Sequence, residues 1–120
     1  MIDHIGLRVA DLRASIEWYR RSLAPLGFEL VASGEGYAGF GPASAPRLWL
    51  HAHAGQPGAG CHIALAAPNR AGVDAFHAAG LAAGAPDNGR PGLRADYAPN
   101  YYAAFLIDPD GNNVEAVCFE

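Results

Sequence analysis

Two histidines and one glutamate are the residues best suited to chemistry in this sequence. His4 opens the first half of the chain, His62 opens the second half, and Glu115 lies in the middle of the last predicted strand. Two neutral imidazoles and one carboxylate suit Fe(II), Mn(II), Zn(II) or Ni(II), and they leave positions open for a bidentate substrate. The alternative is that both histidines are ordinary polar residues on a strand face and that Glu115 is exposed to water.

An internal repeat would position these residues. Shifting the sequence by 58 positions places the segment 4–7 (His-Ile-Gly-Leu) on the segment 62–65 (His-Ile-Ala-Leu), and it aligns two expected helix N-caps, Asp11 and Asn69. The sequence therefore predicts an α+β fold of two βαβββ modules, residues 1–55 and 61–120, in pseudo-twofold pairing around a mixed sheet. Matching positions in such a pair approach a common axis, so His4 and His62 should meet on the sheet face away from the helices.

Apolar periodicity predicts the individual elements. Two amphipathic helices are expected, one starting at Leu12 and stopping near Gly27 or, alternatively, earlier because of Pro25, and one following Asn69 and stopping at Gly84. A linker rich in glycine and proline is expected at 56–60, and the stretch 87–99 should be mostly irregular, with one short strand at most. The expected strands are 2–9, 28–32, 37–40, 47–53, 61–67, 101–107 and 113–119.

Composition excludes some classes of function. The 120 residues carry a formal net charge of −4, and all eight basic residues are arginines spread along the chain, so we expect no nucleic-acid partner. No apolar run approaches the roughly 20 residues of a membrane helix, and the N-terminus has no signal-peptide pattern. We therefore expect a cytoplasmic protein without membrane association. Cys61 and Cys118 are expected to be buried, reduced thiols.

Three segments together carry a resemblance to a known family. They are 4–9 (His-Ile-Gly-Leu-Arg-Val), 62–65, and the closing 108–115 (Asp-Pro-Asp-Gly-Asn-Asn-Val-Glu). With them the chain resembles the vicinal oxygen chelate superfamily, also called the glyoxalase/bleomycin-resistance/dioxygenase family, over nearly its whole length. The resemblance implies a divalent metal at His4, His62 and Glu115, a small-molecule substrate that chelates it through neighbouring oxygens, and a homodimer.

The sequence departs from one branch of that family at Trp49, where enzymes of the glyoxalase I type carry a second glutamate. The remaining ligand set is closer to the dioxygenase and fosfomycin-type branches. Glu115 and His51 are the candidate catalytic residues; His51 shares the strand face of Trp49 and could transfer protons or be a fourth ligand, the alternative being a surface histidine. The candidate substrate-binding residues are Trp49, Arg94, Tyr97, Asn100 and Tyr101.

Two functional classes remain open on this evidence. The first is a metal-dependent lyase, isomerase, ring-opening dioxygenase or thiol transferase. The second is a metal-free protein that sequesters a drug or metabolite, as bleomycin-resistance proteins do. The presence of all three ligand types favours the first class.

Overall fold

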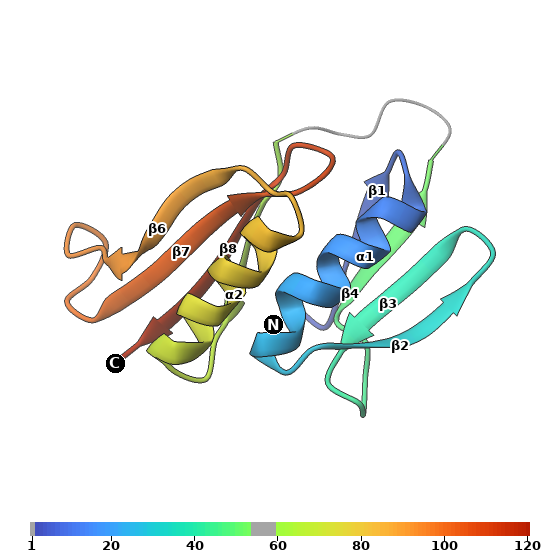
Figure 1. The fold of residues 1–120 in the computed structure, drawn as a ribbon. Coiled ribbons are helices and arrows are strands. Elements are labelled where there is room, and N and C mark those ends of the chain that lie inside the picture. The colour runs from blue at the N-terminus through green and yellow to red at the C-terminus, as the bar shows by residue number, and fades with distance from the viewer. Residues whose placement is uncertain (1, 54–59) are drawn as a thin grey trace.

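The computed structural model describes residues 2–53 and 60–120, which form two modules of the same βαβββ order (Figure 1). The predicted α+β class is thereby confirmed. Most of the predicted linker falls within 54–59, outside the described residues. The first module contains β1 (Ile5–Val9), α1 (Leu12–Leu23), the 3₁₀ turn η1 (Ala24–Leu26), β2 (Glu29–Gly34), β3 (Tyr37–Gly41) and β4 (Leu48–Ala52). The second contains β5 (His62–Ala66), α2 (Arg70–Ala82), β6 (Asp87–Leu93), β7 (Tyr101–Ile107) and β8 (Asn113–Phe119).

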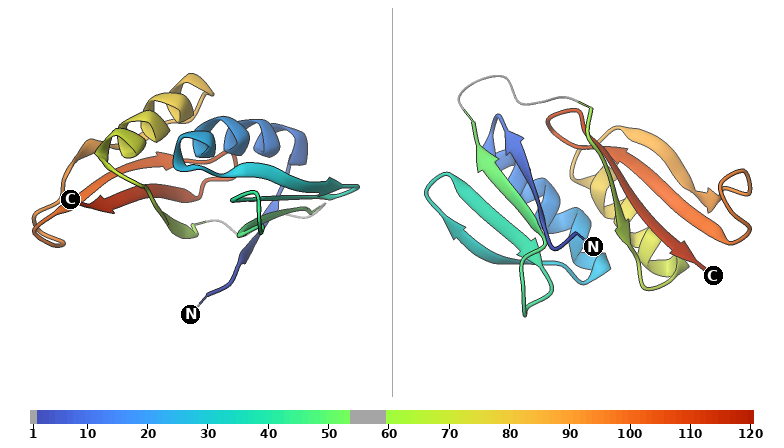
Figure 2. Two further views of the ribbon diagram at one scale, coloured as in Figure 1. Left: turned by 90° about the horizontal axis from the view of Figure 1, so that it is seen from below. Right: turned by 180° about the vertical axis from the view of Figure 1, so that it is seen from behind.

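Each module forms its own four-stranded mixed sheet. The strand orders are β1-β4-β3-β2 and β5-β8-β7-β6, and the first strand of each module runs parallel to the last. Both helices lie on one side of the sheets, and β1 and β5 face each other at the centre of the molecule (Figure 2). We call the opposite side the helix-free face. Gly6 pairs with Trp49 and Ala64 pairs with Glu115, so Trp49 and Glu115 occupy equivalent positions in the two sheets.

The helices begin where the sequence predicts. The Asp11 side chain accepts a hydrogen bond from the Ala14 backbone N–H at 3.1 Å, and the Asn69 side chain accepts one from Gly72 at 2.8 Å. The first helix ends at Leu23, the earlier of the two ends that the sequence allows, and continues as a 3₁₀ turn. Pro25 explains this early end, because its ring nitrogen has no hydrogen to donate to the preceding helical turn.

The stretch 87–99 contains the one strand that the sequence allows, Asp87–Leu93, and at seven residues this strand is longer than expected. Its pairing with β7 is interrupted on both sides of Gly89, where φ is 156°. Pro91 also has no N–H to pair. Such interruptions remove the polar–apolar alternation on which strand prediction depends.

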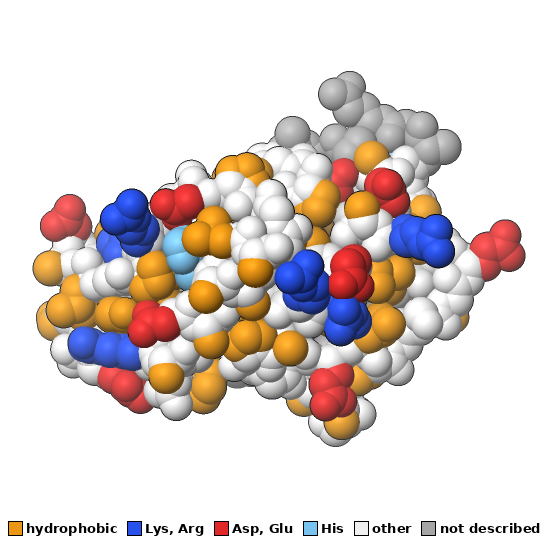
Figure 3. All heavy atoms as spheres, in the orientation of Figure 1, with side chains coloured by type: hydrophobic (Ala, Val, Ile, Leu, Met, Phe, Trp, Pro, Cys, Tyr) orange, Lys and Arg blue, Asp and Glu red, His pale blue; other side chains and the backbone are white. Residues whose placement is uncertain are grey.

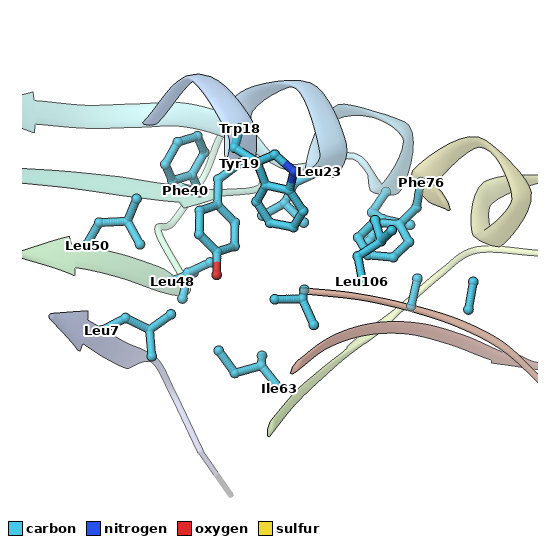
Figure 4. Close-up of a cluster of buried hydrophobic side chains, with 14 of the residues drawn as sticks. Leu7, Trp18, Tyr19, Leu23, Phe40, Leu48, Leu50, Ile63, Phe76 and Leu106 are labelled. Carbon is cyan, nitrogen blue, oxygen red and sulfur yellow. The ribbon is translucent and has the colours of Figure 1, made fainter. Parts of the chain in front are cut away.

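One hydrophobic core lies between the helices and the sheets and spans both modules (Figure 4). Trp18, Tyr19 and Leu23 enter it from α1, and Phe76 enters from α2. The helices approach each other at Gly80, because the Trp18 indole N–H donates to the Gly80 carbonyl at 3.3 Å. A Cβ on Gly80 would lie 2.2 Å from Leu106 Cδ1 of β7, so a side chain at position 80 would disturb the packing of α2 on its own sheet.

A buried carboxylate also joins the modules. Asp108 is 3% exposed and lies in the turn between β7 and β8. It accepts hydrogen bonds from the Tyr19 hydroxyl at 2.6 Å, from the backbone of Asp110 and Asn112 at 2.9 and 2.8 Å, and from Asn112 Nδ2 at 2.9 Å. Burial, together with the adjacent Asp108 carboxylate, raises the pKa of Tyr19 well above its usual value. The turn at 108–112 is thus also a contact between modules.

The surface carries dispersed charges. On the helix-covered side, acidic and arginine side chains are interspersed with apolar groups (Figure 3). Within residues 2–53 and 60–120, neither α1 nor α2 has the length and apolar character needed to cross a bilayer. The expectation of two buried thiols is wrong for Cys61, which is exposed because it precedes β5; Cys118 is buried, and both are free.

The Tyr19–Asp108 hydrogen bond should contribute measurably to stability. We expect Tyr19→Phe to lower the free energy of unfolding by about 1.5–3 kcal/mol, because it leaves a buried carboxylate without one of its donors. Tyr102→Phe is a matched control, since Tyr102 also donates to a carboxylate at 2.6 Å, that of Asp74, but at the surface. Its effect should stay within about 0.5 kcal/mol in chemical denaturation. Equal losses in the two variants would contradict the assignment.

Candidate functional site

Glu115 is buried on the helix-free face of the second sheet, with 1% of its surface exposed. The alternation along β8 directs Val114 and Ala116 into the core beneath the helices and Glu115 to the other side. A second apolar cluster covers Glu115 there, built from Ala103, Phe105, Val117 and the partly buried Tyr101. A carboxylate in such surroundings requires hydrogen-bond donors.

Two side chains supply those donors. His62 Nε2 lies 2.7 Å from Glu115 Oε2 and, when it carries the ring proton, donates it to that oxygen. The Tyr101 hydroxyl donates to Oε1. Burial, together with the hydrogen bond to Glu115 and its negative charge, raises the pKa of Tyr101 to about 12. Tyr101 therefore remains a proton donor to Glu115 at neutral pH.

His62 connects the buried Glu115 carboxylate to an open cavity. Its side chain is 54% exposed, and the cavity has a volume of about 430 Å³. His4 lines the same cavity from the opposite module, and its Nδ1 is hydrogen-bonded to Asp3 Oδ1 at 2.8 Å. The cavity is lined by Ile2–Ile5, Arg47 and His62–Leu65.

The structure brings the three predicted ligands together only in part. His62 and Glu115 are in direct contact, and His4 shares a cavity with His62. Within the described ranges, 2–53 and 60–120, no group of three His, Cys, Asp or Glu side chains is close enough to hold one metal ion. His4 and the pair would have to approach each other before all three could bind the same ion.

The hydrogen bonding of Glu115 leaves room for a metal ion. An ionised carboxylate has about four lone-pair sites. Asp108 fills that number with its four donors, whereas Glu115 has one donor on each oxygen. An ion between His62 and Glu115 would replace their shared hydrogen. These two residues therefore fit the implied metal, with His4 as the candidate third ligand.

Trp49 and His51 belong to an adjoining cavity. It has a volume of about 460 Å³ and is lined by His4, Gly6, Trp49 and His51. The His51 ring lies over Gly6, whose missing Cβ would be 3.4 Å from the ring. His4 lines both cavities, so a ligand beside His4 could reach His51 as well.

The other predicted substrate-binding residues lie farther out. Tyr97 is 64% exposed and packs edge-on against Tyr101 at a centroid distance of 5.2 Å. Asn100 is exposed in the turn before β7. The Arg94 guanidinium lies 5.3 Å from the Phe105 ring centroid and donates to the carbonyls of Gly92 and Arg90. Tyr97 and Arg94 thus contact members of the cluster that covers Glu115, and Tyr101 is the predicted tyrosine that is hydrogen-bonded to Glu115 itself.

Sequence reasoning missed the two charged side chains of the cavity, Arg47 and Asp3. Arg47 Nη1 donates to Asp3 Oδ2 at 3.2 Å, while Asp3 Oδ1 contacts His4. The available signal was the alternation of Arg47, directly before β4, with Trp49 and His51 in that strand. His77, in contrast, is 6% exposed and its Nε2 lies 2.8 Å from Asp87 Oδ1, so it joins α2 to β6.

Comparison with known proteins was informative for the family and the fold. The sequence model of the Glyoxalase/Bleomycin resistance protein/Dioxygenase superfamily matches residues 1–116. A glyoxalase/bleomycin resistance protein from Albidiferax ferrireducens T118 is similar in structure, with TM-score 0.82, 28% identity, and 95% of this chain and 94% of the other covered. A family enzyme from Burkholderia phytofirmans PsJN has TM-score 0.76 at 16% identity, with 99% and 98% covered. No match to a curated protein was found.

The pKa of Tyr101 tests the contact with Glu115. We expect Glu115→Gln to lower it from about 12 toward 10 without reaching 10, because the negative charge is lost while the burial remains. Tyrosine ionisation followed by ultraviolet absorbance or NMR, assigned with Tyr101→Phe, measures the change. Asp74→Asn is the control, since Asp74 accepts from Tyr102 and should leave Tyr101 unaffected. A Tyr101 pKa that does not respond to Glu115→Gln would contradict the geometry.

Proposed function

The chain belongs to the glyoxalase/bleomycin resistance protein/dioxygenase superfamily, and we propose that it is a metal-dependent enzyme acting on a small oxygenated molecule. The observation that supports this proposal is the buried Glu115 carboxylate in contact with His62, whose other side opens to a cavity. Burying a carboxylate is costly, and a few polar groups that converge at a cavity are typical of a small-molecule site.

In this proposal His62 and Glu115 hold a divalent ion, Fe, Mn, Zn or Ni, and His4 completes the set. Bound there, the metal would polarise a carbonyl or activate water and accept two neighbouring oxygens of the substrate. The chain's own residues would position the metal-binding carboxylate and exchange protons with the substrate. Tyr101 fixes the Glu115 carboxylate through its hydroxyl, and His51, in the adjoining cavity, is placed to exchange a proton with a bound molecule.

The remaining candidates would bind the substrate rather than react with it. Trp49 would form an apolar wall of the His51 cavity. Arg94, Tyr97 and Asn100 would contact parts of the substrate that extend over the second sheet. The reaction class in this proposal is a lyase, isomerase or dioxygenase reaction.

A metal-free binding protein is the second candidate function. His62 and Glu115 already satisfy each other, and the described residues contain no three-residue metal-binding group. Both facts are compatible with a site that sequesters an oxygenated molecule through hydrogen bonds alone. In this case the Glu115 cluster would bind and release its ligand unchanged.

We also propose that the protein forms a homodimer. Each sheet ends in strands with an unpaired edge, β1 and β2 in the first and β5 and β6 in the second. Large apolar side chains are exposed on the second module at Leu93, Tyr97 and Phe119. A second copy is a suitable partner for such surfaces, and light scattering coupled to gel filtration would measure the mass.

Metal binding separates the two functions. We expect one divalent ion per chain in isothermal titration with Zn²⁺ or Mn²⁺. His62→Ala and Glu115→Gln should weaken binding by at least about a hundredfold, because even residues that only support metal ligands contribute 10–100-fold. His53→Ala is the matched control, a histidine outside the two cavities, and it should bind as the wild type does. Equal, weak affinities in the wild type and all three variants would favour the metal-free alternative.

A further inference from the structure

The helix-free face of the first sheet is aromatic and basic around the cavities that contain His4. Leu48 and Leu50 of β4 are buried in the core, so Arg47, Trp49 and His51 project to the other side. Arg8 lies opposite His51 in the strand register and adds a second positive charge to this face. The second sheet presents Glu115 instead at the position of Trp49, so the two halves of the face have different chemistry.

The Trp49 indole lies flat against its sheet. A Cβ on Gly39, the residue that pairs with Trp49 across β3 and β4, would lie 2.8 Å from Cζ3 and 2.9 Å from Cε3 of the indole. Any other residue at position 39 would lift the ring. Tyr37 is a neighbour at a centroid distance of 6.2 Å. The result is a planar aromatic surface that forms part of the cavity beside His4 and His51.

Arg47 is positioned at one end of this surface by Asp3. Asp3 contacts His4 through Oδ1 and Arg47 through Oδ2, so one carboxylate orients both side chains toward the 430 Å³ cavity. The hydrogen bond with His4 and the charge of Arg47 hold the pKa of Asp3 below its usual value. Within the described residues Asp3 is the only acidic partner of Arg47, and the Nε and Nη2 hydrogens of Arg47 make no hydrogen bond to the chain.

We propose that the ligand of this site is a planar organic anion, with its unsaturated ring on Trp49 and its carboxylate or phosphate on Arg47. Arg47 directly precedes β4 and Trp49 is the second residue of that strand, so their Cα atoms are about 7 Å apart in extended chain. His4 lines both of their cavities, so one small molecule beside His4 can contact both residues. A guanidinium with free N–H groups suits an oxyanion, and a flat indole suits a planar ring. The inference rests on the proposed function for its site and adds the chemical class of the ligand.

Three probes separate ring from charge: benzoate has both, benzyl alcohol has only the ring, and cyclohexanecarboxylate has only the charge. Binding is measured on metal-stripped protein in EDTA by following the Trp49 indole N–H in NMR. The Trp18 indole, which is buried and bonded to Gly80, is the internal reference. We expect benzoate to bind at least about tenfold more tightly than either of the other probes.

Variants assign each preference to one residue. Arg47→Gln should remove the preference for benzoate over benzyl alcohol, and Arg47→Lys should restore part of it. Trp49→Leu lacks the indole reporter, so its binding is measured by isothermal titration; it should lose the preference for benzoate over cyclohexanecarboxylate. Arg20→Gln is the matched control, because Arg20 is also about half exposed and paired with an acid, Glu17; it should change nothing. Unchanged thermal unfolding would show that the variants are folded.

Equal affinities for the three probes, or benzoate binding that survives Arg47→Gln, would overturn the inference. The inference would also be overturned if none of the probes shifted the Trp49 resonance while sedimentation showed a dimer, because a second copy would then cover this face. The experiment contains no metal, so its failure is distinct from failure of the proposed metal site. A protein that binds no metal but shows the expected probe preferences would support the ligand class alone.

Discussion

A carboxylate removed from water has to be hydrogen-bonded, and two buried carboxylates determine how this chain is organised. Asp108 accepts four hydrogen bonds, one of them from Tyr19 of the other module, and so it fixes the modules relative to each other. Glu115 accepts two and retains capacity for another ligand. A buried carboxylate therefore stabilises the fold at Asp108, whereas the carboxylate of Glu115, seven positions later, can still bind a ligand.

The two modules share a topology but present different surfaces. At equivalent positions on the helix-free face, the second module carries Glu115 and the first carries Trp49, which lies flat because position 39 is glycine. His4 and His62 lie between them and line a common cavity. A duplicated unit thus provides an acidic, hydrogen-bonded half and an aromatic, basic half around one space.

The sequence predicted the repeat, the α+β class and both helix caps, because these depend on local periodicity and on side chains close in sequence. It did not predict the bounds of β6, where Gly89 and Pro91 interrupt the alternation, or the burial of Asp108, which depends on Tyr19 from 89 positions away. At the site, alternation placed Glu115 on the correct face. The bridge from Asp3 to Arg47 spans 44 positions and could be found only in three dimensions.

The most direct test of the account is anomalous diffraction from crystals grown with Zn²⁺. The account predicts a peak about 2.0–2.2 Å from Nε2 of His62 and from a carboxylate oxygen of Glu115, with Tyr101 still bonded to that carboxylate. A peak at the His77–Asp87 pair instead, or none anywhere while the His62–Glu115 hydrogen bond persists, would contradict it.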